Sequence, residues 1–390
     1  MRIEDRVAAH VAQVPPSGIR TFFDIVSEMK DAISLSVGEP DFVTPWNIRE
    51  NAIYALERGR THYTSNSGLL ELRELICQYY HQRFGVSYQP GQVLVTVGAS
   101  EAIDLAVRAL VEPGDEVLIP APSYVSYEPT VALAHGVPVP IPTSAADSFK
   151  LDPQVVRSLI TPKTKAMVLP YPNNPTGAVM GREDLLALAR VLEDTDVVVI
   201  SDEIYAELTY GADHVSIASI PSMFDRTIVI NGFSKAFAMT GWRLGYAIAH
   251  PALLGAMLKI HQFTMLCANI MSQYAGVEAL RHGLDSGFAS VDAMRREYDR
   301  RRNYIVAGLN RMGLTCFEPR GAFYAFPSIQ STGMKSEEFC EKLLYAKQVA
   351  VVPGTAFGSF GEGFVRISYA ASLENIKTAL GRTEEFIEGR

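Results

Sequence analysis

The sequence predicts an α/β protein: a three-layer α/β/α large domain on a mostly parallel mixed sheet, beside a smaller α+β domain. Three observations support this class. The chain has 390 residues, which is more than one compact core usually holds. Over residues 69–250, short apolar runs alternate with helical patterns, as expected for a sheet covered on both faces. From about residue 290 the pattern changes to a long polar helix followed by short strands.

The predicted large domain spans residues 46–280. Continuous apolar runs of strand length predict buried strands, because helices cover both faces of a parallel sheet. These strands are expected at residues 92–97, 115–120, 164–170, 196–201 and 226–232. Between them, apolar residues at helical spacing predict helices at 100–111 and 182–194.

The predicted small domain combines residues 1–45 with residues 281–390. Its strands are expected at 322–327, 349–354 and 364–370, with helices between and after them. The basic cluster "RREYDRRRN" at 295–303 is interleaved with Glu297 and Asp299. That mixture predicts the solvated face of a helix rather than a track for phosphates.

Composition excludes several classes of partner. The net charge of −8 argues against a nucleic-acid binder. The longest apolar runs, such as "VVVI" at 197–200, are far shorter than the roughly 20 residues of a membrane helix. The N-terminal residues lack an apolar signal core, and the four cysteines form no Cys-x-x-Cys pair. We therefore expect a cytoplasmic protein with reduced cysteines and no membrane partner.

Polar residues follow several predicted strands, where α/β sheets bind ligands. After the strand ending at Val97, Gly98 permits a tight turn and a helix starts near Ser100. Its free amides and dipole could hold a phosphate, although Ser100 could equally be an N-cap, with Glu101 in the first turn. Tyr124 follows the next strand and could stack on a flat ring, or simply pack in the core.

The next two strand exits carry an amide and a carboxylate. Asn174 precedes a proline in "YPNNPTG", so its backbone is held extended; a strong turn is the alternative. Asp202 ends an entirely apolar strand, where a carboxylate is costly without a positive partner. It would suit a pyridinium nitrogen, with Tyr205 three residues later. The alternative is a helix N-cap.

The stretch "INGFSKAFAMTGWRLGYAIAH" at 230–250 places Ser234, Lys235 and Arg243 at a fifth strand exit. Lys235 lies between Phe233 and Phe237, a setting that lowers the pKa of an amine and suits a Schiff-base lysine. Arg243, which the apolar surroundings predict to be buried, offers a planar fork for a phosphate.

Together these groups fit one ligand, pyridoxal 5′-phosphate. They comprise a phosphate cradle, a stacking ring, an amide, an anion for a ring nitrogen and an imine-forming amine. No P-loop or His-Glu-x-x-His motif occurs, so we expect neither a P-loop nucleotide site nor a metal.

In chain order, the motifs resemble those of the fold-type I, class I/II aminotransferases, from about residue 15 to 386. They are "VGEPDF", "THYTSNSGLLELR", "GASEAI", "NNPTG", "SDEIY", "SKAFAMTGWRLGY" and "FVRISYA". The phrasing of several is similar to a bacterial branch that includes aminotransferase A and N-acetyl-L,L-diaminopimelate aminotransferase.

The resemblance implies a role for each residue around the cofactor. Lys235 would form the imine with the pyridoxal aldehyde, and Asp202 would pair with the pyridinium nitrogen. Tyr205 and Asn174 would contact the 3′-oxygen, and Tyr124 would stack on the ring. The phosphate would be held by Gly98, Ala99, Ser100, Ser234 and Arg243.

The resemblance also implies how substrate and partner subunit bind. Arg366 of "FVRIS" would grip the substrate α-carboxylate, with Gly38 lining the same pocket. Tyr63 would reach the phosphate of the neighbouring subunit, which implies a homodimer with active sites at the interface. Gly232 stands where many relatives have a serine, so one phosphate contact is expected to be missing.

The implied activity is transfer of an amino group between an L-amino acid and a 2-oxo acid, with 2-oxoglutarate as the expected acceptor, by a ping-pong mechanism. The donors that the resemblance implies are N-acetyl-L,L-diaminopimelate, aromatic amino acids or a broad range. A carbon–sulfur β-lyase on the same scaffold and a non-catalytic module that senses pyridoxal phosphate are the alternatives. Side-chain specificity is open, because Ile19, Phe22, Phe23, Tyr124 and Tyr127 could form an aromatic or aliphatic pocket or could pack between domains. No arginine is evident for a second carboxylate, which argues against strict aspartate specificity.

Overall fold

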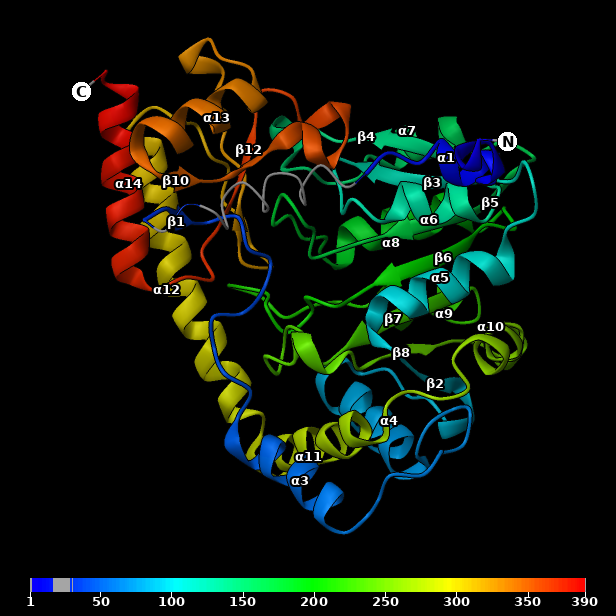
Figure 1. The fold of residues 1–390 in the computed structure, drawn as a ribbon. Helices are drawn as coiled ribbons and strands as arrows, with labels where there is room; N and C mark the ends of the chain where they lie inside the picture. Colours follow the sequence, from blue (N-terminus) through cyan, green and yellow to red (C-terminus); the bar gives the residue numbers. More distant parts are fainter. Residues whose placement is uncertain (1, 17–28, 30, 390) are drawn as a thin grey trace.

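The protein is described by a computed structural model that places residues 2–16, 29 and 31–389. Its centre is a seven-stranded sheet with the strand order β2-β8-β7-β6-β5-β3-β4 (Figure 1). Only β8 runs antiparallel to the other six, so the sheet is mostly parallel and mixed, as predicted. The strands are β2 (Val93–Thr96), β3 (Glu116–Ala121), β4 (Val137–Pro142), β5 (Thr164–Leu169), β6 (Val198–Asp202), β7 (Thr227–Gly232) and β8 (Gly245–Ile248).

The five strands predicted from apolar runs, β2, β3, β5, β6 and β7, are confirmed. Two strands of the sheet were not predicted, the antiparallel β8 and the edge strand β4. In β4, prolines occupy alternate positions in "VPVPIP", which weakens any strand prediction. The Val137 amide points toward β3 and donates to the Asp115 carbonyl. Amides along a strand point alternately to its two sides, so Pro138 and the prolines that follow stand where an amide would point away from β3.

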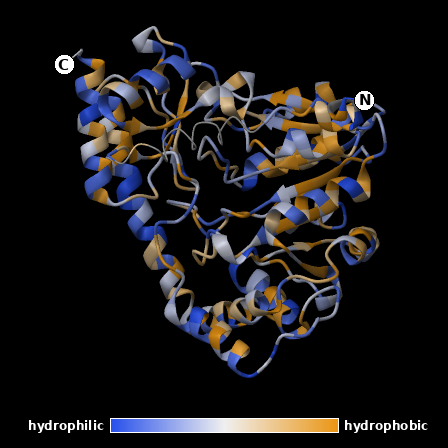
Figure 2. Ribbon diagram, in the orientation of Figure 1, coloured by the Kyte–Doolittle hydropathy of each residue, from blue (hydrophilic) through white to orange (hydrophobic). Residues whose placement is uncertain are grey.

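Helices cover both faces of the sheet, and successive strand residues divide between them. In β7, Ile228 and Ile230 pack toward α5, α6 and α10, whereas Val229 packs toward α4 and α11. Farther along the second face, α7 and α8 cover β5 and β6. In Figure 2 the strands are mostly hydrophobic and the outer helix faces hydrophilic. These helices are α4 (Leu70–Phe84), α5 (Gly98–Leu110), α6 (Tyr127–Leu133), α7 (Pro153–Leu159), α8 (Arg182–Leu192), α10 (Pro251–Thr264) and α11 (Ile270–Ser286).

A second core lies beyond the carboxyl end of the sheet, around two small sheets. β1 pairs in parallel with β10, and β12 lies between β11 and β9. The predicted strand at 349–354 is therefore two strands, because the chain changes partner at Val351. The strands are β1 (Ile33–Ser34), β9 (Tyr324–Ala325), β10 (Val349–Ala350), β11 (Val352–Pro353) and β12 (Val365–Ser368).

The long helix α12 (Ala289–Arg311) runs from the α3–α11 end of the molecule to this second core (Figure 1). The prediction that its basic cluster is wholly solvated is wrong. Arg301 and Arg302 are buried, and they pair with Asp41 and Glu318 respectively, at 2.8 and 2.9 Å. The remaining helices are α1 (Ala9–Ala12), α3 (Trp46–Glu57), α9 (Pro221–Phe224), α13 (Ser336–Lys347) and α14 (Leu373–Ile387).

The parallel strands end at one edge of the sheet, which faces the second core. Asp202 is the last residue of β6, and Ser234 and Lys235 follow the end of β7 by two and three residues. The polar residues of the strand exits are thus gathered at that edge. Among the described residues, no helix is both long and apolar enough to cross a membrane.

Candidate active site

A cavity of about 530 Å³ opens at the carboxyl edge of the sheet. Of the thirteen residues predicted for cofactor and substrate, eleven line it, although they are separated by up to 328 positions between Gly38 and Arg366. Gly98 and Tyr63 are the two that do not. The lining residues from the predicted set are Gly38, Ala99, Ser100, Tyr124, Asn174, Asp202, Tyr205, Ser234, Lys235, Arg243 and Arg366.

The Lys235 amine lies inside this cavity and is surrounded by protein. It donates to the Gly38 carbonyl at 2.5 Å and lies 5.6 Å from the ring centroids of both Tyr205 and Phe323. Burial lowers the pKa of Lys235 to about 8, and the positive charges of Arg366 and Arg243 act in the same direction. The neutral form of the Lys235 amine, which is the nucleophile and base, therefore becomes the major form near pH 8 instead of near 10.5.

The Asp202 carboxylate is buried, with 5% of the residue exposed. The Tyr127 hydroxyl donates to Oδ2 at 2.7 Å, and the Ile204 amide donates to Oδ1 at 3.1 Å. Burial raises the pKa of Asp202 to about 6, although both hydrogen bonds act to lower it. Among the described residues, no helix begins after Asp202 before the short 3-10 helix Ile217–Ser219, so Asp202 is not the helix N-cap that the sequence allowed.

Arg366 on β12 is a buried guanidinium without an ion pair among the described residues. It donates to Asn174 Oδ1 at 2.9 Å and to the Ser36 carbonyl at 2.6 Å, and its Nε meets no hydrogen-bond partner in the described part of the chain. The guanidinium lies 4.5 Å from the ring centroid of Tyr324 and 4.9 Å from that of Phe357. A buried cation with donors to spare is a site for an anionic ligand.

The turn before α5 has the backbone of an anion cradle. Gly98 has φ +76, and a Cβ there would lie 2.9 Å from Arg243 Nη2. The helix begins at Gly98 with Val97 at the N-cap, so the alternative that Ser100 is the N-cap is wrong. Arg243 is exposed rather than buried as predicted, because it follows the short turn Thr240–Trp242 at the cavity mouth.

Two tyrosines complete the walls of the cavity, and sequence reasoning did not assign their contacts. Tyr127 holds Asp202, as described above, and Tyr324 places its hydroxyl 2.8 Å from that of Tyr205. The only sequence indication for Tyr324 was its place in the predicted strand 322–327. Of the residues proposed for side-chain specificity, Ile19, Phe22 and Phe23 lie outside the described residues.

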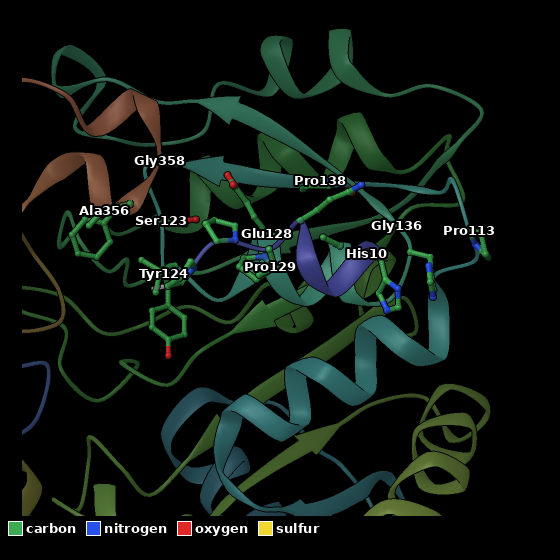
Figure 3. Close-up of a pocket in the computed structure, with 18 residues that line it drawn as sticks. His10, Pro113, Ser123, Tyr124, Glu128, Pro129, Gly136, Pro138, Ala356 and Gly358 are labelled. Carbon is green, nitrogen blue, oxygen red and sulfur yellow. The ribbon is translucent and has the colours of Figure 1, made fainter. Parts of the chain in front are cut away.

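Tyr124 is partly buried and packs edge-on against Tyr127, with ring centroids 5.6 Å apart. It also borders a second cavity of about 700 Å³, where His10, Glu128 and Gly358 lie (Figure 3). Tyr63, by contrast, is 83% exposed and contacts neither cavity. No cluster of three or more His, Cys, Asp or Glu side chains suited to a metal ion occurs in the part of the chain that the structure describes.

Comparison with known proteins decides which family this geometry belongs to. The model of aminotransferase class I and II matches residues 30–382. This chain is a class I and II aminotransferase. The aminotransferase is 52% identical to YugH of Bacillus subtilis, which is described only provisionally as an aminotransferase, over 97% of each chain.

Other relatives of this aminotransferase carry different substrate names. An aspartate aminotransferase of Pyrococcus abyssi is 46% identical over 96% of each chain. A B. subtilis protein provisionally named N-acetyl-LL-diaminopimelate aminotransferase is 43% identical, over 96% of this chain and 94% of that one. The crystal structure of an aromatic aminotransferase from Pyrococcus horikoshii has a TM-score of 0.90 and 45% identity, covering 95% of this chain and 99% of that one.

The lowered pKa of Lys235 predicts how this aminotransferase reacts with amine reagents. Since the pKa is near 8 instead of 10.5, the neutral amine forms as the pH rises through about 8. Trace acetylation of the cofactor-free protein, quantified on the Lys235 peptide, should rise to a plateau with that midpoint. Glu39→Gln should move the midpoint to lower pH, because the Glu39 carboxylate raises the pKa of Lys235. A midpoint near 10.5 in the unmodified sequence would contradict the assignment.

Proposed function

We propose that this aminotransferase uses pyridoxal 5′-phosphate, attached to Lys235, to move an amino group between an L-amino acid and a 2-oxo acid. The observation that carries the proposal is the shared cavity of Lys235, Asp202 and Arg366. An amine with a lowered pKa, a buried carboxylate and a buried guanidinium lie there, and each lacks an ion-pair partner among the described residues.

The residues present fit the cofactor. The cradle at Gly98 has room for a phosphate only because glycine lacks a Cβ, and Arg243 faces the same space. Within the described ranges Asp202 is hydrogen-bonded only to a hydroxyl and a backbone amide and to no cation, so it can accept a ring N–H. Ala99, Ser100 and Ser234 line the phosphate end of the cavity, and Tyr124 lies at its wall as the stacking ring.

Asn174 and Tyr205 would hold the 3′-oxygen. Because Arg366 donates to Asn174 Oδ1, the amide is oriented with its Nδ2 donor free to meet an oxygen. The Tyr205 hydroxyl is held by Tyr324 at 2.8 Å and retains capacity for a second hydrogen bond. Both groups are therefore oriented before any ligand binds.

When bound, the cofactor supplies an electron sink for the bond broken at the substrate Cα. Asp202, whose pKa is about 6, is ionised at neutral pH and would hold a proton on the ring nitrogen. Lys235 would hold the cofactor through its aldehyde, and its amine is placed to take the proton from the substrate Cα as a general base and to return it as a general acid. Arg366 fixes the substrate by its carboxylate, so that Cα faces the Lys235 amine.

The reaction of the enzyme with an amino acid alone tests this function. An aminotransferase should stop after one half-turnover with its cofactor in the amine form, whereas a β-lyase would continue to release ammonia and pyruvate. A non-catalytic sensor would do neither. Lys235→Ala should lose both the half-reaction and the absorption of the lysine-bound cofactor, and retention of both would refute the assignment of Lys235.

Arg366→Ala should raise the KM for the amino acid while leaving cofactor affinity nearly unchanged. Loss of a charge-assisted carboxylate contact costs about 1.5–3 kcal/mol, or roughly 10- to 150-fold in KM. Steady-state kinetics and a cofactor titration measure the two quantities. Arg320→Ala is the control, because that side chain is 60% exposed and lies outside the cavity. Loss of cofactor binding in Arg366→Ala would show that Arg366 has another role.

For the substrates, we propose 2-oxoglutarate as acceptor, a ping-pong mechanism and a broad range of donors that includes aromatic amino acids. The three cations lining the cavity in the described part of the chain are Lys235, Arg243 and Arg366, each with a role already proposed. That set leaves no further cation of the described lining for a side-chain carboxylate, so it supports donors with uncharged side chains, and the second carboxylate of 2-oxoglutarate would have to bind a residue outside this lining. A panel of donors, scored by formation of the amine form of the cofactor, separates this range from the aspartate, aromatic and diaminopimelate specificities that name the relatives.

We further propose a homodimer in which Tyr63 of one subunit reaches the phosphate site of the other. Tyr63 and Phe263 are 83% and 86% exposed, and exposed rings that share one surface are typical of an interface. Asn66 donates to the Leu266 carbonyl at 2.7 Å, so the loop that carries Tyr63 lies beside the end of α10 that carries Phe263. The exposed rings therefore belong to one surface.

Sedimentation should show a dimer, and Phe263→Glu should shift it toward monomer and weaken cofactor binding, because a buried charge at an interface is costly. Tyr345→Glu is the matched control: Tyr345 is also an exposed aromatic, at 63%, but lies on α13. A monomeric parent protein with full activity would contradict the proposal.

A further inference from the structure

Glu101 and His261 form a buried pair behind the candidate phosphate turn. Glu101 lies in the first turn of α5 and His261 near the end of α10, helices that pack against each other beside the sheet (Figure 1). Glu101 Oε1 lies 2.7 Å from His261 Nδ1, and the two side chains are 8% and 0% exposed. Neither residue lines the cavity, so neither touches what binds there.

The second carboxylate oxygen of Glu101 closes the turn itself. Glu101 Oε2 accepts the Val97 amide at 2.5 Å, which ties the residue before Gly98 to the first turn of the helix. The Thr96 hydroxyl donates to the Gly98 carbonyl at 3.0 Å. The Val97 amide is thus used internally, and the first amides of α5, which have no partner within the helix, remain for a ligand.

On its other side the turn is pressed against β8. A Cβ on Gly245 would lie 2.4 Å from the Gly98 carbonyl carbon and 2.5 Å from the Ala99 nitrogen. The backbone of the turn is therefore confined between β8 and the Glu101 side chain. Glu101 is the only hydrogen-bond partner of the His261 ring among the described residues, because His261 Nε2 is buried without one.

Electrostatics alone does not explain a carboxylate in the first turn of α5 if that turn binds a phosphate. An anion in the first helical turn is favourable in the absence of ligand, but it opposes a phosphate bound at the same helix end. The Glu101 carboxylate instead holds the turn in shape through the Val97 amide, and a hydrogen bond from His261 offsets part of the cost of burying that carboxylate.

We infer that the Glu101–His261 pair positions the turn that binds the cofactor phosphate. Both are positioning residues, since they act through the Val97–Ser100 backbone. The inference rests on the proposed function, in which this turn holds the phosphate of pyridoxal phosphate. Disrupting the pair weakens binding of the phosphorylated cofactor selectively and leaves binding of its phosphate-free form almost unchanged.

The experiment measures the affinity of the cofactor-free enzyme for pyridoxal phosphate and for pyridoxal. The quantity compared is the affinity for pyridoxal phosphate divided by the affinity for pyridoxal. Glu101→Ala and His261→Leu should lower that ratio roughly tenfold, the typical effect of removing a partner that orients a binding group. The single substitutions Glu101→Gln and His261→Asn should keep the ratio near that of the parent enzyme. Gln can still accept the Val97 amide, and Asn can still donate near the Nδ1 position. Thermal unfolding of each variant shows that it is folded.

A second buried histidine–glutamate pair is the matched control. His214 Nε2 lies 3.4 Å from Glu203, away from the turn, so His214→Gln should leave the ratio unchanged even if stability falls. Equal losses for both ligands in Glu101→Ala and His261→Leu, an unchanged ratio or tighter phosphate binding would each overturn the inference. If the parent enzyme itself shows no preference for the phosphorylated form, and inorganic phosphate does not compete, the proposed phosphate site fails instead.

Discussion

The fold holds charged groups in one cavity without giving them ion-pair partners, and the rest of the site follows from that constraint. Among the described residues, the hydrogen-bond partner of Lys235 is a carbonyl, those of Asp202 are a hydroxyl and a backbone amide, and those of Arg366 are a side-chain amide oxygen and a carbonyl. Unpaired buried charges are costly. They are tolerated because neutral hydrogen-bonding groups hold the charged side chains in place, and a charged ligand can then supply the missing ion-pair partners.

The scaffold makes this arrangement possible because its parts are held from both sides. The apolar strands β6 and β7 are packed between helices, so Asp202 and Lys235 leave the sheet at fixed positions. Arg366 comes instead from β12 in the second core, and Tyr324 on the neighbouring β9 contacts both Arg366 and Tyr205. One tyrosine thus links the guanidinium of Arg366 to the hydroxyl of Tyr205. In our proposal, the Glu101–His261 pair supports the phosphate end of the site in a comparable way.

Most of the large sheet could be predicted because a strand buried on both faces must be continuously apolar. The same logic failed for β4, where alternate prolines are tolerated only because the strand is at an edge. It also failed for 349–354, because a switch of partner at Val351 leaves no mark in hydropathy. The burial of Arg301 was likewise unpredictable, since its partner Asp41 lies 260 residues away in the sequence.

The sequence by itself determined the α/β class, the positions of five main strands and eleven of the residues that line the cavity, because periodicity, strand-exit chemistry and family motifs are written in short segments. The tertiary structure decided which groups touch. It placed Gly38 on the Lys235 amine, Tyr127 on Asp202, Asn174 on Arg366 and His261 on Glu101. Each contact joins segments at least 75 residues apart, and only packing of the whole chain sets such distances.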